Sequence, residues 1–274
     1  MSKFKDIVPA PFCFSQSSLQ DYTDCPRRFE LRYIDQIQWP AIETAPVLEN
    51  ERRQIEGQIF HRMVQQYFIG LPVEKITPFA SSENLIRWWE NFLAQRLDFP
   101  EYKIFTELSL STPIGSHRLI AKFDLLAVKV GEHAVIYDWK TYRSKPKRNW
   151  ILDRLQTKAY LSLILRTGQS VNNGASINPD QTEMVYWFSD YPDKPEVIKF
   201  DHFQFEQTWN NLENLVSEID ARQSYPMTEN IKQCSYCVYR SYCERGISAG
   251  EEDNIDAIDQ TIDIDFDQIQ EIEF

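Results

Sequence analysis

Three strand-like segments in the middle of the chain constrain its fold most strongly. Residues 103–110, 118–130 and 133–140 are rich in strand-forming side chains and are joined by short turns, which predicts a meander of three strands. Residues 152–166 then have a helical pattern, and residues 183–189 again have a strand pattern. A helical crossover after a meander usually pairs the next strand in parallel. The sequence therefore predicts an α/β fold with a mixed central sheet.

Helices are predicted on both sides of this region. Residues 15–24 form a short helix with a serine cap, and Pro26 can begin the next helix because proline suits a first turn. The other predicted elements are helices at residues 49–68, 85–97 and 202–219 and a strand at residues 196–200. We therefore expect helices to flank the sheet and to form both ends of the folded body.

The charge of the chain is distributed unevenly. The 274 residues include 41 Asp or Glu and 29 Lys or Arg, and the net charge of -12 by itself argues against a nucleic-acid ligand. Residues 250–274, however, contain ten of the acidic residues and no Lys or Arg, so the rest of the chain has a net charge of -2. We expect one domain over residues 14–247 and an acidic tail over residues 248–274. The tail is either disordered and solubilising or a regulatory strand that imitates DNA or docks on a partner.

Signals for a membrane or a secreted protein are missing from the sequence. No segment approaches the ~20 consecutive apolar residues of a membrane span, and the N-terminus, MSKFKDIVPAPF, has no apolar signal region. A cytoplasmic location is expected. In that compartment, clustered cysteines are more often metal ligands or catalytic groups than disulfides.

Two carboxylates and a lysine stand out in the strand region. Asp138 and Lys140 share a face of their strand, and Asp124 interrupts the apolar run of the preceding strand. The residues expected on the same face as Asp124 are Ile120, Lys122 and Leu126. Two neighbouring carboxylates are oxygen ligands of the kind that Mg²⁺ prefers, and the lysine could activate water or stabilise charge on a phosphate. The alternative is an ordinary surface ion pair between Asp138 and Lys140.

Two helical pairs add further candidates. Gly57 and His61 are four residues apart, so the histidine lies over a position where backbone or ligand can approach closely. Gln156 and Tyr160 have the same spacing on the helix after the Asp138 strand and offer an amide and a phenol to a phosphate or a base. Taken alone, each pair also fits ordinary helix packing.

Four cysteines form a predicted metal site. Cys234, Cys237 and Cys243 lie close together in the sequence, and Cys25 can supply a fourth sulfur, whereas Cys13 is a spare. Four thiolates suit either tetrahedral zinc or an iron–sulfur cluster, and their spacing does not separate the two. Such a site would join the two ends of the domain. The alternative is a set of unrelated buried thiols.

Basic side chains gather near these cysteines and after the Lys140 strand. Arginine interleaved with tyrosine suits single-stranded DNA, through phosphate pairing and base stacking. The candidates near the cysteines are Arg27, Arg28 and Arg240, and those after the strand are Arg143, Lys145, Lys147 and Arg148. For the second group, a solvated basic loop is the alternative.

The order of these motifs resembles that of the PD-(D/E)XK nuclease superfamily. It consists of GxxxH at 57–61, a strand carrying Glu107, FD at 123–124, DWK at 138–140 and QxxxY at 156–160. Together with the opening segment SQSSLQDYTDCPRRFELRYI, it is similar to the RecB-like and Cas4-like exonuclease branch, which includes the nuclease domain of AddB. The resemblance covers about residues 14–246 and implies a restriction-endonuclease-like core.

The resemblance also implies roles for individual residues. His61, Asp124, Asp138 and the Trp139 carbonyl would hold Mg²⁺ or Mn²⁺, with Glu107 as a weaker candidate. Lys140 would be the catalytic lysine, and Gln156 and Tyr160 would position the substrate. The cysteine pattern is that of branch members with a [4Fe-4S] cluster, which leaves zinc as the alternative. Lys122 stands where family members often have glycine, which could crowd the site or add a phosphate contact.

Three functions remain open from the sequence. The first is a metal-dependent DNA exonuclease acting on single-stranded ends in repair, recombination or a related pathway. The second is a catalytically silent scaffold that holds DNA or a partner nuclease or helicase. The third is a zinc-stabilised DNA-binding module. The trio Asp124, Asp138 and Lys140 favours the enzyme, because a silent module does not need it. No P-loop is present, so unwinding would need a helicase or another repair protein as partner.

Overall fold

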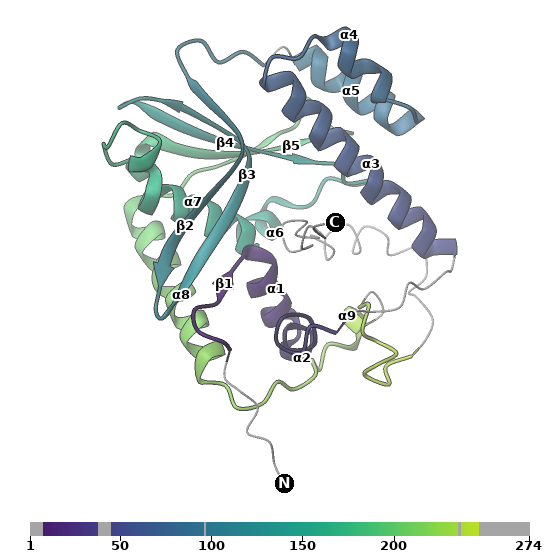
Figure 1. The fold of residues 1–274 in the computed structure, drawn as a ribbon, viewed down its shortest axis with the longest axis vertical. Helices are drawn as coiled ribbons and strands as arrows, with labels where there is room; N and C mark the ends of the chain where they lie inside the picture. The colour runs from purple at the N-terminus through teal and green to yellow at the C-terminus, as the bar shows by residue number, and fades with distance from the viewer. Residues whose placement is uncertain (1–7, 38–44, 96, 235–236, 247–274) are drawn as a thin grey trace, which may run out of the picture.

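The computed structural model describes residues 8–37, 45–95, 97–234 and 237–246. Within them, six strands form one mixed sheet (Figure 1). The strands are β1 (Cys13–Phe14), β2 (Lys103–Ile114), β3 (His117–Lys129), β4 (His133–Lys140), β5 (Thr182–Phe188) and β6 (Glu196–Ile198). Their order is β1-β3-β4-β5-β6, with β2 also paired to β3. The predicted α/β class and the predicted mixed sheet are confirmed.

The direction of each strand pair follows its connection. β2, β3 and β4 form the antiparallel meander, with turns at Gly115 and Gly131, whose positive φ angles of 56° and 78° suit glycine. The crossover helix after β4 makes β4 and β5 parallel, and β6 then pairs antiparallel with β5. The short β1, which the sequence patterns do not predict, pairs in parallel with β3 at residues 118–119.

The helices lie on both faces of the sheet (Figure 1). They are α1 (Gln16–Asp24), α2 (Pro26–Phe29) continued by a π-helical turn (Glu30–Ile34), α3 (Ala45–Phe68), α4 (Val73–Ile76), α5 (Glu83–Gln95), α6 (Arg148–Asp153), α7 (Leu155–Thr167), α8 (His202–Ala221) and α9 (Ile231–Cys234). Single 3₁₀ turns occur at Thr77–Phe79, Gly168–Ser170 and Pro179–Gln181. Pro26 begins α2 as predicted. The helix predicted at 152–166 is divided at Arg154, whose ψ of 138° is extended and separates α6 from α7.

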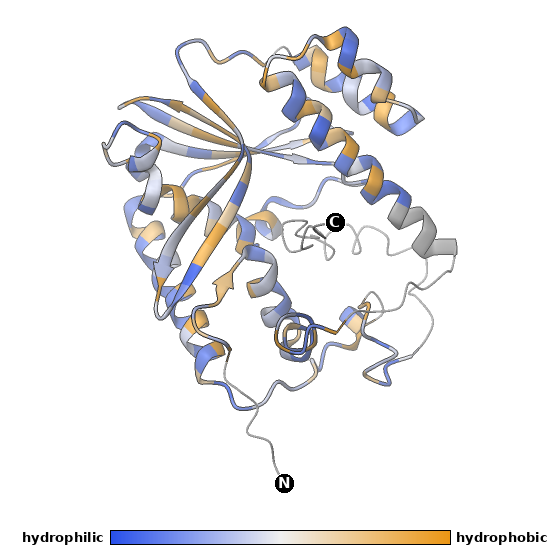
Figure 2. Ribbon diagram, in the orientation of Figure 1, coloured by the Kyte–Doolittle hydropathy of each residue, from blue (hydrophilic) through white to orange (hydrophobic). Residues whose placement is uncertain are grey.

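Two hydrophobic cores cover the two faces of the sheet, and hydrophobic residues run along the strands between them (Figure 2). One core packs α1, α7 and α8 against the sheet and includes Leu161 and Trp209. The other packs α3 and α5 and includes Phe60, Trp89 and Trp139. The sheet therefore holds helices from both ends of the chain in fixed positions.

Side-chain alternation along β3 breaks at Asp124. Phe123 and Leu126 both face the core of α7, whereas Leu125 faces the core of α3. The predicted common face for Asp124 and Leu126 is therefore wrong. Glu107 of β2 lies between Thr106 and Leu108, which both pair with β3, and it has a positive φ of 54°. The β2–β3 hairpin is therefore irregular at this point. The irregularity turns Asp124 toward α3.

Within the described ranges, no helix combines the length and apolar character needed to cross a membrane. The predicted acidic tail at residues 248–274 lies outside the described residues.

Candidate active site

The candidate site lies where β3 and β4 part. The last paired residues of the two strands are Leu125 and Tyr137, and Asp124 and Asp138 come one position further along. β2 occupies one edge of β3 along its length, so β1 and β4 share the other edge. Between them, residues 120–124 of β3 have no strand partner on that edge within the described chain. The sheet therefore presents both carboxylates at an opening in its hydrogen-bond ladder.

Asp138, Lys140 and Gln156 form a closed triangle of polar contacts. Lys140 Nζ lies 3.0 Å from Asp138 Oδ2 and donates to Gln156 Oε1 at 2.9 Å. Gln156 Nε2 donates to Asp138 Oδ1 at 2.7 Å. Asp138 is 3% exposed and Lys140 is 8% exposed, which excludes the surface ion pair that the sequence left open. Because a buried charge is costly without partners, this triangle holds the lysine in one place.

Asp124 is bound from the other side by α3 and β4. Asp124 Oδ2 lies 3.3 Å from Nδ1 of His61 and accepts the Trp139 N–H at 2.9 Å. Burial alone would raise the pKa of Asp124, but His61, the Trp139 N–H and Lys140 outweigh it and lower the pKa. Burial alone would lower the pKa of His61, and the neighbouring Asp124 raises it above its ordinary value. Both shifts have the same main electrostatic cause, the attraction between the Asp124 carboxylate and a protonated His61 ring.

Tyr160 and Lys122 close the open edge of β3. The Tyr160 hydroxyl donates to the Lys122 carbonyl at 2.8 Å, so it takes the place of a missing strand. The Lys122 ammonium lies 2.7 Å from Glu107 Oε2. Burial and the charge of Asp124 raise the pKa of Glu107, against the lowering effect of Lys122. Lys122, which stands where members of the resembled family often have glycine, is thus paired with a carboxylate on β2.

The donors near the β3–β4 opening suit a hard divalent cation. Asp124 and Asp138 supply carboxylate oxygens and His61 an imidazole, a set that fits Mg²⁺ or Mn²⁺. The N–H and C=O of one strand residue point toward the same edge, so the Trp139 carbonyl faces the opening with its N–H. Among the described residues, no three His, Cys, Asp or Glu side chains already converge as a metal site. His61 instead contacts Asp124 directly.

The basic segment after β4 is anchored by one carboxylate. Glu196 Oε1 lies 2.5 Å from Lys145 Nζ, and Glu196 Oε2 lies 2.7 Å from Arg148 Nη1. Arg148 also donates to the Val197 carbonyl at 3.0 Å. Lys147 is exposed, and Arg143 is half-buried with its carbonyl accepting from Tyr191. Two of the four predicted DNA contacts therefore already hold a carboxylate partner.

This anchor gives a pH-dependent contribution to stability. Partial burial would raise the pKa of Glu196, but Lys145 and Arg148 hold it below its ordinary value of 4.5. A lowered pKa stabilises the fold above pH 4.5, and the contribution disappears as the pH falls through the folded-state pKa. Glu196→Gln should therefore cost up to about 1 kcal/mol in unfolding free energy at pH 7 and progressively less below pH 4.5.

Urea unfolding at several pH values measures this effect. Glu90→Gln, which changes an exposed carboxylate on α5, is the matched control. An equal loss for Glu196→Gln at neutral and acidic pH would show that the ion pairs do not stabilise the segment.

The four predicted cysteine ligands line one small cavity. Cys25, Cys234, Cys237 and Cys243 surround it together with Arg28 and other side chains. Burial raises the pKa values of Cys237 and Cys243, and neighbouring cysteines raise them further. The Arg27 N–H donates to the Pro226 carbonyl at 3.1 Å, so the two chain ends meet here. Cys13 is exposed on β1, away from this group.

The arginines around these cysteines also have protein partners. Arg28 lies 2.8 Å from Asp21 and 2.7 Å from Asp24, and Arg27 pairs with Glu30. Arg240 is buried in the wall of the cavity. In this arrangement they stabilise the cysteine lobe, by which we mean α1, α2 and the described residues 226–234 and 237–246.

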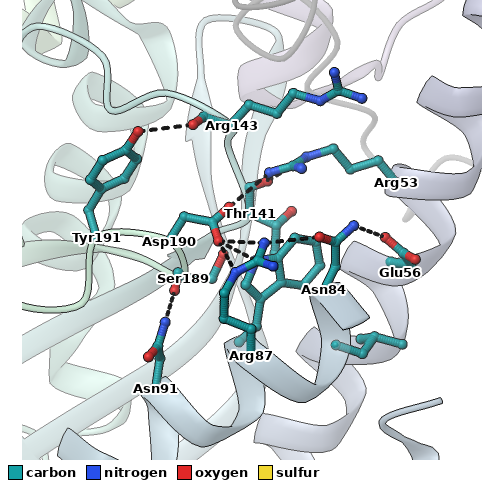
Figure 3. Close-up of polar contacts among 12 residues, drawn as sticks. Arg53, Glu56, Asn84, Arg87, Asn91, Thr141, Arg143, Ser189, Asp190 and Tyr191 are labelled. Carbon is teal, nitrogen blue, oxygen red and sulfur yellow. Dashed lines mark hydrogen bonds and ion pairs between the residues drawn. The ribbon is translucent and has the colours of Figure 1, made fainter. Parts of the chain in front are cut away.

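The sequence motifs do not include a second polar network, which follows Lys140 at the end of β4. Asp190, just after β5, accepts from Arg53 of α3 and from Arg87 of α5 (Figure 3). Arg53 also donates twice to the Thr141 carbonyl, next to Lys140. The only sequence signal is spacing, because Arg53 lies four residues before Gly57 on the same helical stripe as His61.

The chain matches one family profile and is similar to several solved structures. A sequence profile for the PD-(D/E)XK nuclease superfamily matches residues 13–244. The solved structure of SSO0001 has 12% sequence identity and a TM-score of 0.40, and the match covers 86% of this chain and 87% of that one. An exonuclease candidate from Eubacterium rectale has 10% identity and a TM-score of 0.48, covering 88% and 91%. No curated protein matches the chain.

Proposed function

The chain belongs to the PD-(D/E)XK nuclease superfamily, and on that premise we propose that it is a metal-dependent exonuclease of the RecB and Cas4 type. Its mixed sheet with flanking helices is consistent with the restriction-endonuclease-like fold of that superfamily. The proposed reaction is hydrolysis of phosphodiester bonds at the ends of single-stranded DNA, in the cytoplasm, during repair, recombination or a related process.

One observation carries the catalytic proposal. Lys140 is held between Asp138 and Gln156, and the neighbouring strand carries Asp124, which contacts His61 of α3. A structural ion pair would not need a second, half-buried carboxylate and an imidazole at the same opening. The arrangement combines ligands for a cation with an ammonium group that can meet the charge of a phosphate.

The residues of the site have distinct proposed tasks. His61, Asp124, Asp138 and the Trp139 carbonyl would hold Mg²⁺ or Mn²⁺, which when bound lowers the pKa of water and polarises a phosphate oxygen. Lys140 keeps its proton at Nζ beside Asp138 and presents that charge to the scissile phosphate. Gln156 fixes the orientation of both side chains. Tyr160 acts by holding the β3 backbone at Lys122, which aligns the substrate side of the site.

The cysteine lobe is proposed to hold a [4Fe-4S] cluster, with zinc as the alternative. The support is that all four thiols border one small cavity, which Arg28 also lines. A cluster or zinc ion bound to all four sulfurs would offset the repulsion between thiolates through metal–sulfur bonds. It would also join the two ends of the domain. Its proposed role is structural.

Single-stranded DNA is the proposed substrate, guided by the exposed cations near the site. Lys147 is exposed after β4, and Arg143 lies on the same segment. The other predicted DNA-binding residues have side chains that already have protein contacts or are buried, so they would attract DNA through positive potential. They are Lys145, Arg148, Arg27, Arg28 and Arg240. A helicase or another repair protein would supply the single strand.

Labelled DNA substrates test the proposal. The full chain should release nucleotides from a linear single strand with Mg²⁺ or Mn²⁺, act more slowly on a duplex, and leave a single-stranded circle intact. Asp138→Asn should bind the linear strand and leave it uncut. Cutting of the circle would identify an endonuclease, and binding without any metal-dependent cutting by the unmodified chain would identify the silent scaffold.

A further inference from the structure

We propose that Asp190 and Arg53 are positioning residues that hold α3 against the ends of β4 and β5 and thereby place His61 beside Asp124. This inference rests on the proposed function for its catalytic consequence. The network it describes, however, is a property of the fold and can be tested separately from cleavage.

Asp190 is the centre of the network (Figure 3). Its Oδ2 lies 3.2 Å from Nη2 of Arg53, and its Oδ1 accepts from Nε of Arg87 at 2.9 Å. The indole N–H of Trp88 also donates to Oδ1 at 2.9 Å. One carboxylate after β5 therefore binds α3 through Arg53 and α5 through two adjacent residues.

Arg53 connects the same carboxylate to the end of β4. Its Nε and Nη2 donate to the Thr141 carbonyl at 3.0 and 2.6 Å. Its guanidinium carbon lies 5.2 Å from the centre of the Trp88 ring, a cation–π arrangement. Thr141 directly follows Lys140, so the position of Arg53 is fixed relative to the catalytic lysine.

The contacts of Arg53 continue along one stripe of α3. Arg53, Gly57 and His61 are four residues apart and so face the same side of the helix. A Cβ at Gly57 would come within 3.1 Å of Thr141 Oγ1, so α3 passes close to the end of β4. One turn later, His61 meets Asp124 at 3.3 Å. The helix is therefore located by Arg53 at one end of the stripe and carries His61 at the other.

The end of β5 completes the connection. The Ser189 N–H donates to the Lys140 carbonyl at 2.8 Å, and Asn91 of α5 donates to the Ser189 carbonyl at 2.8 Å. Asp190, which binds Arg53, directly follows Ser189, which binds the Lys140 carbonyl. His61 and Lys140 thus share one rigid support.

Charge explains why Asp190 is needed. Arg53 is 9% exposed, and its cation would be left in a largely buried position if the carboxylate were removed. Two arginines and the Trp88 indole N–H converge on the Asp190 carboxylate, so both of its oxygens accept hydrogen bonds. Contacts of this kind fix the positions of the elements that they join. Loss of these contacts should let α3 shift and separate His61 from Asp124.

The test compares Asp190→Ala and the milder Asp190→Asn and Arg53→Lys with the unmodified full chain. Asp190→Ala is expected to reduce kcat on linear single-stranded DNA on the order of 10-fold to 100-fold, since small misplacements of catalytic groups have effects of this size. KM for the DNA should change little, and more Mn²⁺ should be needed for half-maximal activity. Asp190→Asn, which keeps an acceptor for Trp88, should recover part of the loss.

Glu218→Gln is the matched control. Glu218 accepts from Tyr22 at 2.7 Å and from Arg222 at 2.6 Å, so removing its charge weakens a contact between α8 and α1 in the other core. It should lower stability without altering the metal requirement. An equal metal requirement in folded Asp190→Ala and in Glu218→Gln would overturn the proposal.

A second measurement does not depend on cleavage. The imidazole NMR signals of His61, identified with His61→Gln, should shift in Asp190→Ala and Arg53→Lys. The imidazole signals of His117 should not shift, because His117 pairs with Asp220 at 3.2 Å in the other core. If the unmodified chain cuts no DNA, the proposed function fails, and the His61 signals still decide this inference. Unchanged His61 signals in both folded variants would contradict it.

Discussion

Replacing Lys140 with methionine is expected to reduce metal-dependent cleavage on the order of 1000-fold, the range for loss of a charged group that acts on the transition state. Methionine keeps much of the side-chain length and removes only the ammonium group that lies 3.0 Å from Asp138. Gln156 would still donate to Asp138, so the carboxylate keeps one partner and the site should remain folded. Cleavage rates at saturating Mn²⁺, with circular dichroism to confirm folding, measure the effect.

Lys199→Met is the matched control for this variant. Lys199 also pairs with a carboxylate, Glu183, at 2.9 Å, but it is largely exposed, outside the β3–β4 opening. Its replacement should leave the cleavage rate within about twofold of the unmodified chain, as expected for a surface ion pair. A folded Lys140→Met protein with the activity of Lys199→Met would remove Lys140 from the mechanism.

Replacing Cys237 with serine is expected to have the largest effect on stability. If the four thiols hold a cluster or zinc, loss of one ligand should abolish most metal binding and the stabilisation of several kcal/mol that metal sites typically provide. The cysteine lobe should then open first, because the four thiols come from both of its parts. Metal and sulfide content after anaerobic purification, together with thermal unfolding, measures the change.

Cys13→Ser is the control, since Cys13 is exposed on β1 and outside the cavity. It should keep the metal content and thermal stability of the unmodified chain. Iron with matching sulfide in the unmodified protein would support the cluster, and zinc alone would support the alternative. Unchanged metal content and stability in Cys237→Ser would rule out a four-cysteine site.

The parts of the fold that sequence could predict are governed by local chemistry. Gly115 and Gly131 mark the turns of the meander because their positive φ angles suit glycine, and Pro26 marks the start of α2. The contact between Lys140 and Asp138 follows from strand periodicity, which puts both on one face. The contact of Gln156 with this pair was not predicted, because spacing and the family resemblance gave Gln156 a role toward the substrate.

The parts that sequence could not predict depend on contacts between distant segments. The break at Asp124 arises where β3 loses one strand partner and Glu107 adopts a positive φ, and neither feature appears in the alternation of β3. The tie between Arg53 and Asp190 joins residues 137 positions apart, with no shared motif. Most predicted DNA-binding arginines and lysines have carboxylate partners, because composition shows which charges exist but does not show which ones meet.

The most direct test of the account is a single cleavage time course. The full chain is mixed with linear, end-labelled single-stranded DNA in EDTA, and Mn²⁺ is then added in excess, with Asp124→Asn treated in parallel. We expect no cleavage in EDTA and prompt release of labelled product after Mn²⁺. Asp124→Asn should leave the DNA intact, because it lacks the carboxylate that lies between His61 and Trp139. Intact DNA after Mn²⁺ addition to the unmodified chain, or equal cleavage by Asp124→Asn, would contradict the account.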